Sequence, residues 1–334
     1  MKEAYLYTQL KDKKTRCDLC NHRCVISDGE KGKCSVRENR DGILYSLVYR
    51  KLISENIDPI EKKPLFNFQP GSYSLSIATV GCNFKCFFCQ NYQISQMPND
   101  KGYIEGRDRS PEDIVNHAIE YDCKSISYTY TEPTVYFEYA YDTAKIAHER
   151  GLKNIFVTNG FMTGECIDMI SPYLDAANID LKSFREETYT EKIGGKLRPV
   201  LENIKNMHNK GIWIEITTLV IPGINDTIKE LEDIACFIAG LDESIPWHIS
   251  AYHPQYKSDI PPTSIDMIDN AISIGKDAGL KYIYGGNIYS GNYENTKCPS
   301  CNSMVIARRG FDVVKRNMTG GKCSNCGTEI DGVF

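Results

Sequence analysis

Three cysteines fall on one short segment of the sequence, residues 79–91, which reads TVGCNFKCFFCQN. Three residues separate Cys82 from Cys86, and two separate Cys86 from Cys89. Three thiolates are one short of the four ligands of a closed, tetrahedral zinc site. A four-iron cluster takes one cysteine per iron, so three cysteines would leave one iron open. The segment therefore predicts a reactive metal site, and a zinc site completed by a distant residue is the alternative.

A second group of cysteines lies near the C-terminus, where Cys298 and Cys301 form one CxxC pair and Cys323 and Cys326 form another. Two such pairs at this separation are typical of a zinc ribbon. Four thiolates also suit iron, so a rubredoxin-like iron site is the alternative. Because four ligands close the coordination sphere, we expect this module to serve the structure or the docking of a partner.

A third group lies near the N-terminus, in the segment CDLCNHRCVISDGEKGKC. Its thiols are those of Cys17, Cys20, Cys24 and Cys34, and His22 is a further candidate ligand. This spacing is compatible with zinc or with an auxiliary iron–sulfur cluster that passes electrons. Zinc is the interpretation that we favour at this stage, and the cluster stays open as the alternative.

The other cysteines, Cys123, Cys166 and Cys236, stand alone, and we predict that they are core residues because free cysteine is commonly buried. The N-terminal segment lacks the apolar stretch of a signal peptide, and no apolar run approaches the roughly 18 residues of a membrane span. We therefore expect a cytoplasmic protein whose thiols stay reduced. The net charge of −5, without a block of like charges, argues against a nucleic-acid-binding surface.

The elements that must position these cysteines alternate between strand-like and helix-like segments. The predicted strands span residues 74–79, 125–130, 154–159, 176–181, 212–220, 247–252 and 281–286. Several βα units in series predict a parallel sheet with right-handed crossovers, either open or closed into a barrel. The loops that follow the carboxyl ends of such strands form the active face. Cys82 follows the first predicted strand directly, so its loop lies where chemistry is expected.

Signals for helix starts and ends support the prediction of βα units. We predict helix starts at Ser110 (with Pro111 at the first helical position), at Thr227, and at Thr263 or Ser264. Thr227 and Glu230 have the spacing of a capping box. Three glycines sit where the residue after a helix needs a positive φ, namely Gly151, Gly211 and Gly279.

The length of 334 residues accommodates one α/β barrel with small modules attached. The texture of the sequence divides the chain into four predicted parts, which are an N-terminal four-cysteine module (1–50), a linker (51–71), a core barrel (72–290) and a C-terminal zinc-ribbon or rubredoxin-like module (291–334).

The segment CNFKCFFC resembles the CxxxCxxC signature of the radical S-adenosylmethionine (radical SAM) enzymes. Further segments resemble those of glycyl-radical-enzyme activases such as the pyruvate formate-lyase activating enzyme, in the same order: YTYTEP (128–133), VTNGF (157–161), NIDLKSF (178–184), TLVIPGIND (218–226) and HISAYHP (248–254). The chain as a whole is most similar to the radical SAM member of the AmmeMemoRadiSam system. The stretches RCDLCNHRCVISDGEKGKCSVREN and GLKYIYGGNIYSGNYENTKCPSC carry that similarity.

This resemblance implies a partial (βα)6 TIM-like barrel with a [4Fe–4S] cluster on Cys82, Cys86 and Cys89. The amine and carboxylate of S-adenosylmethionine would chelate the open iron. One-electron reduction by a flavodoxin- or ferredoxin-like donor would release a 5′-deoxyadenosyl radical, which would abstract hydrogen from a protein or peptide substrate. Modification of a small molecule or tRNA is the alternative within enzymes, and a non-catalytic multi-zinc adaptor is the alternative outside them. Activases with extra clusters usually carry the added cysteines after the first strand's loop, and for that reason we favour zinc in the N-terminal module.

The resemblance also implies cofactor contacts, at Phe88, Asn91, Tyr130, Thr131, Glu132, Thr158, Asn159, Asp180, Lys182 and His253. The backbone of Tyr130 and Thr131 would face the cofactor's amine, although glycines are usual there. Lys182 would bind its carboxylate, Asn159 and Thr158 its ribose or carboxylate, and Phe88 its adenine.

Each of these contacts has a plainer alternative. Glu132 before Pro133 is also typical of a helix entry, and Asn159 before a glycine is typical of a turn. Asp180 and Lys182 share one face of a strand and would also make an internal ion pair. His253 is as compatible with the surface. Activases usually have an acid where this chain has Val157, and Gln90 and Asn91 are candidates to cap the cysteine loop.

Overall fold

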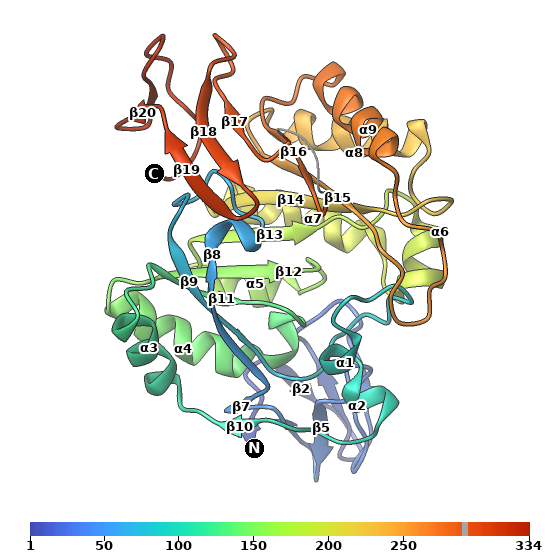
Figure 1. Cartoon of the computed structure of the whole chain (residues 1–334). Helices are drawn as coiled ribbons and strands as arrows, with labels where there is room; N and C mark the ends of the chain where they lie inside the picture. The colour runs from blue at the N-terminus through green and yellow to red at the C-terminus, as the bar shows by residue number, and fades with distance from the viewer. Residues whose placement is uncertain (289–292) are drawn as a thin grey trace.

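A central eight-stranded sheet organises the computed structural model, which describes residues 1–288 and 293–334 (Figure 1). Its strands follow the order β16-β15-β14-β13-β12-β11-β9-β8. Their bounds are β8 (Ser54–Pro59), β9 (Tyr73–Ala78), β11 (Ser125–Tyr128), β12 (Lys153–Thr158), β13 (Ala176–Asp180), β14 (Trp213–Val220), β15 (Trp247–Ala251) and β16 (Ile283–Gly286). All the predicted strands are present and differ from the prediction only at their ends.

The strands from β9 to β16 pair in parallel, and β8 pairs antiparallel with β9. Six βα units, which start at β9, β11, β12, β13, β14 and β15, lead to β16, as the partial barrel requires. In the part of the chain that the structure describes, β8 and β16 are the two edges, so the barrel is open. The parallel strands are largely buried on both faces, and they include buried polar residues such as Ser74, Ser127 and Asn178.

The helices cover the sheet between its strands. They are α1 (Tyr92–Ser95), α2 (Met97–Asp100), α3 (Pro111–Glu120), α4 (Phe137–Glu149), α5 (Gly164–Ile170), α6 (Glu186–Thr188), α7 (Leu197–Asn209), α8 (Ile228–Leu241) and α9 (Ile265–Asp277). Shorter turns are η1 (Ile60–Lys62), η2 (Pro133–Tyr136) and the π-helical η3 (Tyr189–Ile193). Gly151, Gly211 and Gly279 have φ values of 79°, 75° and 92°, as predicted for residues that follow helices.

The predicted helix starts are confirmed, but one predicted capping box is incomplete. Ser110 caps α3 in a full capping box with Asp113, and Ser264 rather than Thr263 caps α9. Thr227 accepts a hydrogen bond from the Glu230 backbone N–H, but the predicted capping box is incomplete. The Glu230 carboxylate instead accepts from Ser183 and Phe184, because this buried acid joins α8 to the loop after β13.

The N-terminal module is built from short strands and lies against the carboxyl ends of the barrel strands. Its strands are β1 (Lys2–Glu3), β2 (Tyr7–Gln9), β3 (Thr15–Cys17), β4 (Val25–Ile26), β5 (Arg37–Arg40), β6 (Ile43–Ser46) and β7 (Lys51–Leu52), which pairs with β10 (Arg107–Asp108). Asn21 donates to the Met162 carbonyl after β12, at 2.6 Å. Leu19 and Val36 belong to the same apolar core as the barrel, so the module is packed onto it.

The segment 51–71 is not the linker that the sequence suggested. It contributes β8 to the central sheet, and Leu65 and Phe68 are buried against the starts of barrel strands. The Glu215 carboxylate on β14 accepts hydrogen bonds from the backbone N–H groups of Phe66 and Asn67 at 2.9 and 2.8 Å. This segment therefore closes the barrel at the end opposite the cysteine loop.

The C-terminal module continues that closure. Its strands are β17 (Thr296–Lys297), β18 (Met304–Arg309), β19 (Asp312–Arg316), β20 (Met318–Thr319) and β21 (Lys322–Cys323). Arg308 is fully buried and pairs with Glu61 at 3.3 Å, and Tyr284 of β16 shares an apolar cluster with Val305. Figure 1 shows the two cysteine-rich modules at opposite ends of the molecule. The predicted module boundary at residues 290–291 lies outside the described residues.

The isolated cysteines divide into two kinds. Cys123 and Cys166 are buried, as predicted, but Cys236 is exposed. The prediction is wrong for Cys236 because α8 buries the face that carries Ile234, Ala235 and Ile238, and Cys236 points away from it. Over residues 1–288 and 293–334, the helices lack the length and apolar character that crossing a bilayer requires.

Candidate functional site

The cysteine loop leaves β9 at the carboxyl end of the parallel sheet, where the active face of such folds lies. Gly81 directly precedes Cys82 and has a φ of 106°, a conformation that favours glycine. A Cβ atom at this position would lie 2.7 Å from Cγ1 of Val36 in the N-terminal module. The loop is therefore held against the N-terminal module by a close contact that only glycine permits.

Phe84 anchors the middle of the loop. Its ring packs against Phe161 and Tyr189, with centroid separations of 5.1 and 6.1 Å. A Cβ atom on Gly195 would lie 2.3 Å from the Phe84 ring, so the turn after η3 also fits closely around it. Gln96 donates to the Phe84 carbonyl at 3.0 Å. These contacts fix the loop from both sides before any metal binds.

The three thiols of the loop lie near one another. The Sγ of Cys82 accepts from the Phe84 backbone N–H at 3.4 Å, and the Sγ of Cys89 lies 3.2 Å from the Ser95 hydroxyl. Burial raises the pKa of Cys82 well above its usual value and that of Cys86 to about 12, and in each case the neighbouring loop cysteines add to the increase. A bound metal ion would reverse this shift, because coordination deprotonates a thiol.

The spacing of these thiols distinguishes a cluster from a single ion. Within residues 1–288 and 293–334, the thiols of Cys82, Cys86 and Cys89 do not lie within 4.8 Å of one another, whereas the four C-terminal thiols do. One ion needs its ligands in mutual contact, but a four-iron cluster takes each cysteine on a separate iron. The donor set therefore fits a cluster better than a shared zinc ion.

Lys182 brings a positive charge to the same space. Its Nζ lies 2.9 Å from Oδ2 of Asp180, as expected for two residues on one face of a strand end. Burial lowers the pKa of Lys182, but Asp180 and Cys86 outweigh that effect and hold it above the usual value. Lys182 in turn opposes the increase in the pKa of Cys86. The predicted ion pair is present, and its ammonium acts on the Cys86 thiol of the loop.

Glu132 connects the ends of β11 and β12. It is completely buried, and its carboxylate accepts hydrogen bonds from Thr134 N, Thr134 Oγ1, Thr158 Oγ1 and Asn159 N, at 2.6 to 3.0 Å. Burial raises its pKa, and the donated hydrogen bonds oppose that increase. With its oxygens engaged in this way, Glu132 positions Thr158 and Asn159, and a direct contact with the cofactor stays a prediction.

Asn159 supports the cysteine loop. Its Nδ2 donates to Oδ1 of Asn83 at 2.7 Å and lies 3.9 Å from the Sγ of Cys82. Its Oδ1 accepts from the Phe161 backbone N–H at 3.0 Å, which is the turn that the sequence suggested as the alternative. The side chain therefore joins the end of β12 to the loop, and its ribose contact stays a prediction.

Tyr130 occupies the place where glycine is usual, with a left-handed backbone φ of 63°. Its hydroxyl donates to Asp58, and Lys63 lies 4.8 Å from its ring centroid. The Nδ2 of Asn91 donates to the Tyr130 carbonyl at 2.8 Å. The structure therefore brings Asn91 and Tyr130 together, and the anchors from residues 58 and 63 maintain a conformation that costs roughly 1 kcal/mol for a residue with a side chain.

The other residues predicted to contact the cofactor have fewer links to the cysteine loop. Thr131 Oγ1 donates to the Thr79 carbonyl at 2.9 Å, and Phe88 is buried beside Phe87. Gln90 is exposed, and so is His253, whose nearest partner is the Asn287 carbonyl at 3.4 Å. These residues lie around the active face, but no contact joins His253 to the cysteine loop among the described residues.

Four residues that contact the site were not predicted from the sequence, namely Asn83, Ser95, Gln96 and Tyr189. Tyr189 accepts a hydrogen bond from the Lys182 backbone N–H at 3.1 Å, so it orients the end of β13. Asn83 lies within the cysteine segment, and Ser95 and Gln96 follow it closely. Their closeness to the cysteines in the sequence could have indicated that they belong to the site. Tyr189 lies on a π-helix that no sequence pattern predicted.

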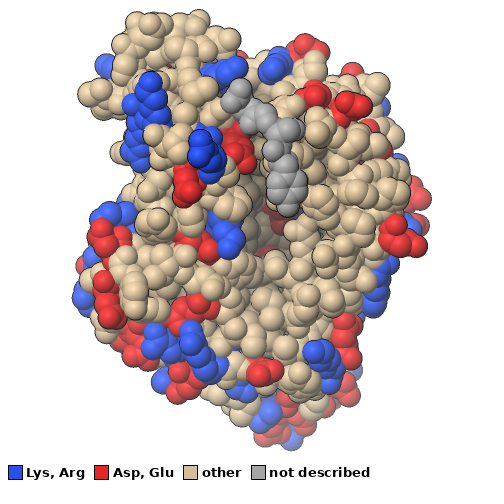
Figure 2. All heavy atoms as spheres, in the orientation of Figure 1, with Lys and Arg blue, Asp and Glu red and all other residues tan. Residues whose placement is uncertain are grey.

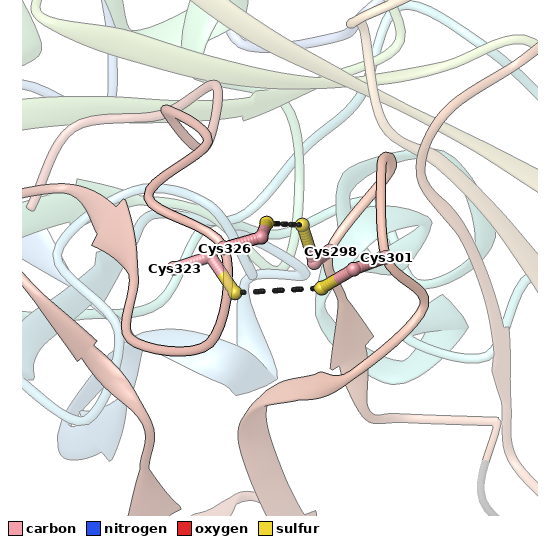
Figure 3. Close-up of side chains that lie close together, drawn as sticks. All are labelled: Cys298, Cys301, Cys323 and Cys326. Atoms are coloured by element: carbon pink, nitrogen blue, oxygen red, sulfur yellow. Dashed lines mark hydrogen bonds between the residues drawn. The ribbon is translucent and has the colours of Figure 1, made fainter.

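The C-terminal thiols form a separate and compact site (Figure 3). The Sγ atoms of Cys298 and Cys326 are 3.6 Å apart, and those of Cys301 and Cys323 are 3.8 Å apart. A tetrahedron with metal–sulfur bonds of 2.3 Å has edges of about 3.8 Å. Contacts with Asn325 and Ser303 lower the pKa of Cys301 to about 5. These four thiols therefore fit one ion with tetrahedral geometry, and its identity as zinc or iron stays a prediction.

Comparison with known proteins agrees with this geometry. The sequence profile of the radical SAM superfamily matches residues 76–238, from β9 into α8. Uncharacterized protein MJ0808 of Methanocaldococcus jannaschii is 44% identical over 335 residues, which cover 99% of this chain and 99% of that protein. The chain belongs to the radical SAM superfamily. It is an enzyme of the activase-like kind, and the predicted fold class is confirmed.

Two further proteins are similar to this radical SAM chain over part of its length. The pyruvate formate-lyase 1-activating enzyme of Escherichia coli strain K12 is 21% identical over 61% of this chain and 89% of its own length. SuiB of Streptococcus suis shares the fold in structures with S-adenosylmethionine and with the precursor peptide SuiA, with TM-scores of 0.51 and 0.50. Those likenesses have 13% and 14% identity, and cover 70% of this chain and 53% and 52% of SuiB.

Proposed function

We propose that Cys82, Cys86 and Cys89 hold a [4Fe–4S] cluster and that the open iron binds S-adenosylmethionine. When bound and reduced by one electron, these groups would break the sulfonium–C5′ bond, which releases methionine and a 5′-deoxyadenosyl radical that would take a hydrogen atom from the substrate. The observation that carries the proposal is the thiol trio at the carboxyl end of β9, in which Cys86 is buried and Cys82 and Cys89 are half-buried. Among the described residues these three sulfur atoms do not all lie within 4.8 Å of one another, and the Lys182 ammonium acts on the Cys86 thiol.

The residues of the chain position the cofactor and exclude water. Lys182 offers its ammonium to the carboxylate of S-adenosylmethionine, while Asp180 keeps that side chain in place. The backbone at Tyr130 and Thr131 faces the amine, and the hydrogen bond from Asn91 ties that backbone to the cysteine loop. Glu132 fixes the neighbouring strand end. On the family resemblance, Phe88 faces the adenine and His253 contacts the cofactor.

The substrate in this proposal is a protein or a peptide. Two observations support that class. The relative from E. coli is named as an activator of another enzyme, and SuiB was solved with a precursor peptide. Lys, Arg, Asp and Glu side chains are interspersed on the face in Figure 2, without the broad basic area that an RNA substrate would favour. A flavodoxin- or ferredoxin-like protein is the proposed electron donor, and the C-terminal thiols are proposed to hold zinc.

The test is anaerobic reconstitution with iron and sulfide, followed by addition of dithionite and S-adenosylmethionine. The proposal predicts formation of 5′-deoxyadenosine by the wild-type protein and by Cys236→Ser, whose exposed thiol lies outside every cysteine group. Cys86→Ala should form none. A wild-type protein that contains zinc without iron, or that binds iron and forms no 5′-deoxyadenosine with any reductant, would instead indicate a non-catalytic adaptor.

A further inference from the structure

The four N-terminal cysteines surround a single cavity beside the cysteine loop. Its lining includes Cys17, Cys20, Cys24, Cys34, Arg37 and Asn83. About 370 Å³ between the lining side chains is not filled by atoms and is partly open to solvent. The four thiols therefore border one common space.

The spacing of these thiols differs from that of the C-terminal four. Among the described residues, no three of the N-terminal thiols lie within 4.8 Å of one another, whereas all four C-terminal thiols do. A tetrahedral zinc site needs sulfur atoms about 3.8 Å apart. The same structure therefore places one cysteine quartet at single-ion spacing and holds the other apart around a cavity.

His22 does not complete a zinc site in this arrangement. Its Nε2 lies 2.8 Å from the Asn83 carbonyl, and its Nδ1 lies 3.5 Å from Nζ of Lys33. With Nε2 donating to a carbonyl, Nδ1 is the nitrogen that could bind a metal, but it faces the Lys33 ammonium. Among the described residues, His22 and any two of these thiols do not all have their ligand atoms within 4.8 Å of one another. The ligand set of the cavity is therefore the four thiols.

Two buried donors on the cavity wall have no acceptor among the residues that the structure describes. They are Nε of Arg37 and Nδ2 of Asn83, on side chains that are 2% and 3% exposed. Arg37 uses its terminal nitrogens on Glu138, at 2.8 Å each, and Asn83 uses its Oδ1 to accept from Asn159. Buried donors are almost always satisfied, so an acceptor in the cavity would account for both. Sulfide and thiolate sulfur atoms of an iron–sulfur cluster are acceptors of this kind.

We propose that Cys17, Cys20, Cys24 and Cys34 hold an iron–sulfur cluster rather than zinc. Four cysteines leave no iron open, so this cluster carries electrons and does not bind S-adenosylmethionine. Asn83 lies on the cavity wall and is the next residue after Cys82, which places the two iron sites on either side of one short segment. The cluster accepts one electron from a ferredoxin- or flavodoxin-like donor and passes that electron to the loop cluster. This electron-passing role rests on the proposed function, whereas the presence of the cluster does not.

The experiment compares iron and acid-labile sulfide in anaerobically reconstituted proteins. The decisive variant is C82A/C86A/C89A, in which the N-terminal module is intact and the proposed loop cluster cannot form. We expect this variant to stay brown and to retain about two or about four sulfides per chain, for a two-iron or a four-iron cluster. Serine substitutions at Cys17, Cys20, Cys24 and Cys34 in the same background should remove that sulfide, and Cys236→Ser should not. Acid-labile sulfide distinguishes a cluster from a single iron ion, because one iron ion at the C-terminal thiols would contribute iron but no sulfide.

A folded loop variant that is free of sulfide and contains an additional zinc ion would overturn this inference. That result would leave the proposed function intact, since wild-type protein would still contain the loop cluster and form 5′-deoxyadenosine. Conversely, sulfide in the loop variant together with no 5′-deoxyadenosine from wild type would contradict the proposed function and support the N-terminal cluster. Circular dichroism of the loop variant establishes that it is folded.

Discussion

At the scale of single residues, the cysteine motif predicted where the site lies. The side chains that support the cysteine loop come from segments distant in the sequence, which the motif does not indicate. Asn159 reaches the loop from β12, and Asp58 reaches Tyr130 from a segment that was expected to be a linker. Residue type and spacing predicted that the three cysteines are metal ligands, because few residue types bind iron and their spacing in a loop is restricted. The supporting contacts depend on the packed fold, since each joins residues far apart in the sequence.

Lys182 permits a direct test of cofactor binding. Replacing it with Ala should raise the KM for S-adenosylmethionine roughly tenfold or more, because a hydrogen bond to a charged group contributes about 1.5–3 kcal/mol. Lys182→Arg should keep part of the affinity, and the exposed Lys192→Ala is the matched control. The iron content of all three variants should equal that of wild type. An unchanged KM in Lys182→Ala would remove Lys182 from the site.

Asp58 gives a prediction that depends on pH. Burial alone would raise its pKa, but hydrogen bonds from Lys63, Tyr130 and Lys62 hold the pKa well below its usual range. A carboxyl with a lowered pKa stabilises the folded protein above its unfolded pKa of about 3.9, and this stability is lost as the pH falls below that value. Asp58→Asn should therefore lower the free energy of unfolding by roughly 3 kcal/mol or more at pH 7, because it leaves Lys63 unpaired.

Denaturant unfolding between pH 7 and acid measures this effect. The difference between wild type and Asp58→Asn should shrink as the pH falls below about 4, and the exposed Asp122→Asn should show no comparable difference. A difference that is constant with pH would show that the carboxylate charge of Asp58 contributes nothing.

At the scale of elements, periodicity and capping residues located the parallel strands and the long helices, because each of these signals is local. β8 was missed since its sequence, SENIDP, is polar and half exposed, as suits an edge strand. The Thr227 and Glu230 pair matched a capping box in spacing, yet tertiary contacts from Ser183 and Phe184 engaged the carboxylate. The cavity of the N-terminal module also lay beyond prediction, because cysteine spacing along a chain does not give the distances between sulfur atoms.

The turn after η3 tests how closely the elements hold the cysteine loop. In Gly195→Ala, the added methyl group would meet the Phe84 ring at 2.3 Å, so the loop must shift. Overpacking of this kind costs roughly 1–3 kcal/mol, and we expect a lower free energy of unfolding together with reduced iron retention. Gly240→Ala on α8 meets no atom within 4 Å and is the control. If the two variants retain iron equally, the packing around Phe84 does not support the cluster.

At the scale of the whole molecule, the two cysteine-rich modules have different relations to the barrel. The N-terminal module lies against the active face and touches the cysteine loop through Val36 and His22. The C-terminal module and residues 60–68 close the opposite end, through Arg308 and a shared apolar cluster. We therefore infer that the first module serves the chemistry and the second serves the stability of the barrel.

The buried pair of Arg308 and Glu61 tests that division. Arg308→Ala would leave Glu61 buried without its partner, which costs roughly 3–5 kcal/mol. The neighbouring Arg309 is exposed, so Arg309→Ala is a matched control. Denaturant unfolding should show the loss only in Arg308→Ala, while the protein that remains folded should form 5′-deoxyadenosine at the wild-type rate. Equal stability of the two variants would show that the C-terminal module does not brace the barrel.

The central claim is that one iron on the loop of Cys82, Cys86 and Cys89 is open and binds S-adenosylmethionine. Electron–nuclear double resonance of the reduced, anaerobic protein with S-adenosylmethionine labelled with ¹⁵N in its amine tests it most directly. We expect a hyperfine coupling between the label and the cluster that disappears in Cys86→Ala and persists in Cys236→Ser. A reduced iron–sulfur signal that is the same with labelled, unlabelled and no S-adenosylmethionine would contradict it.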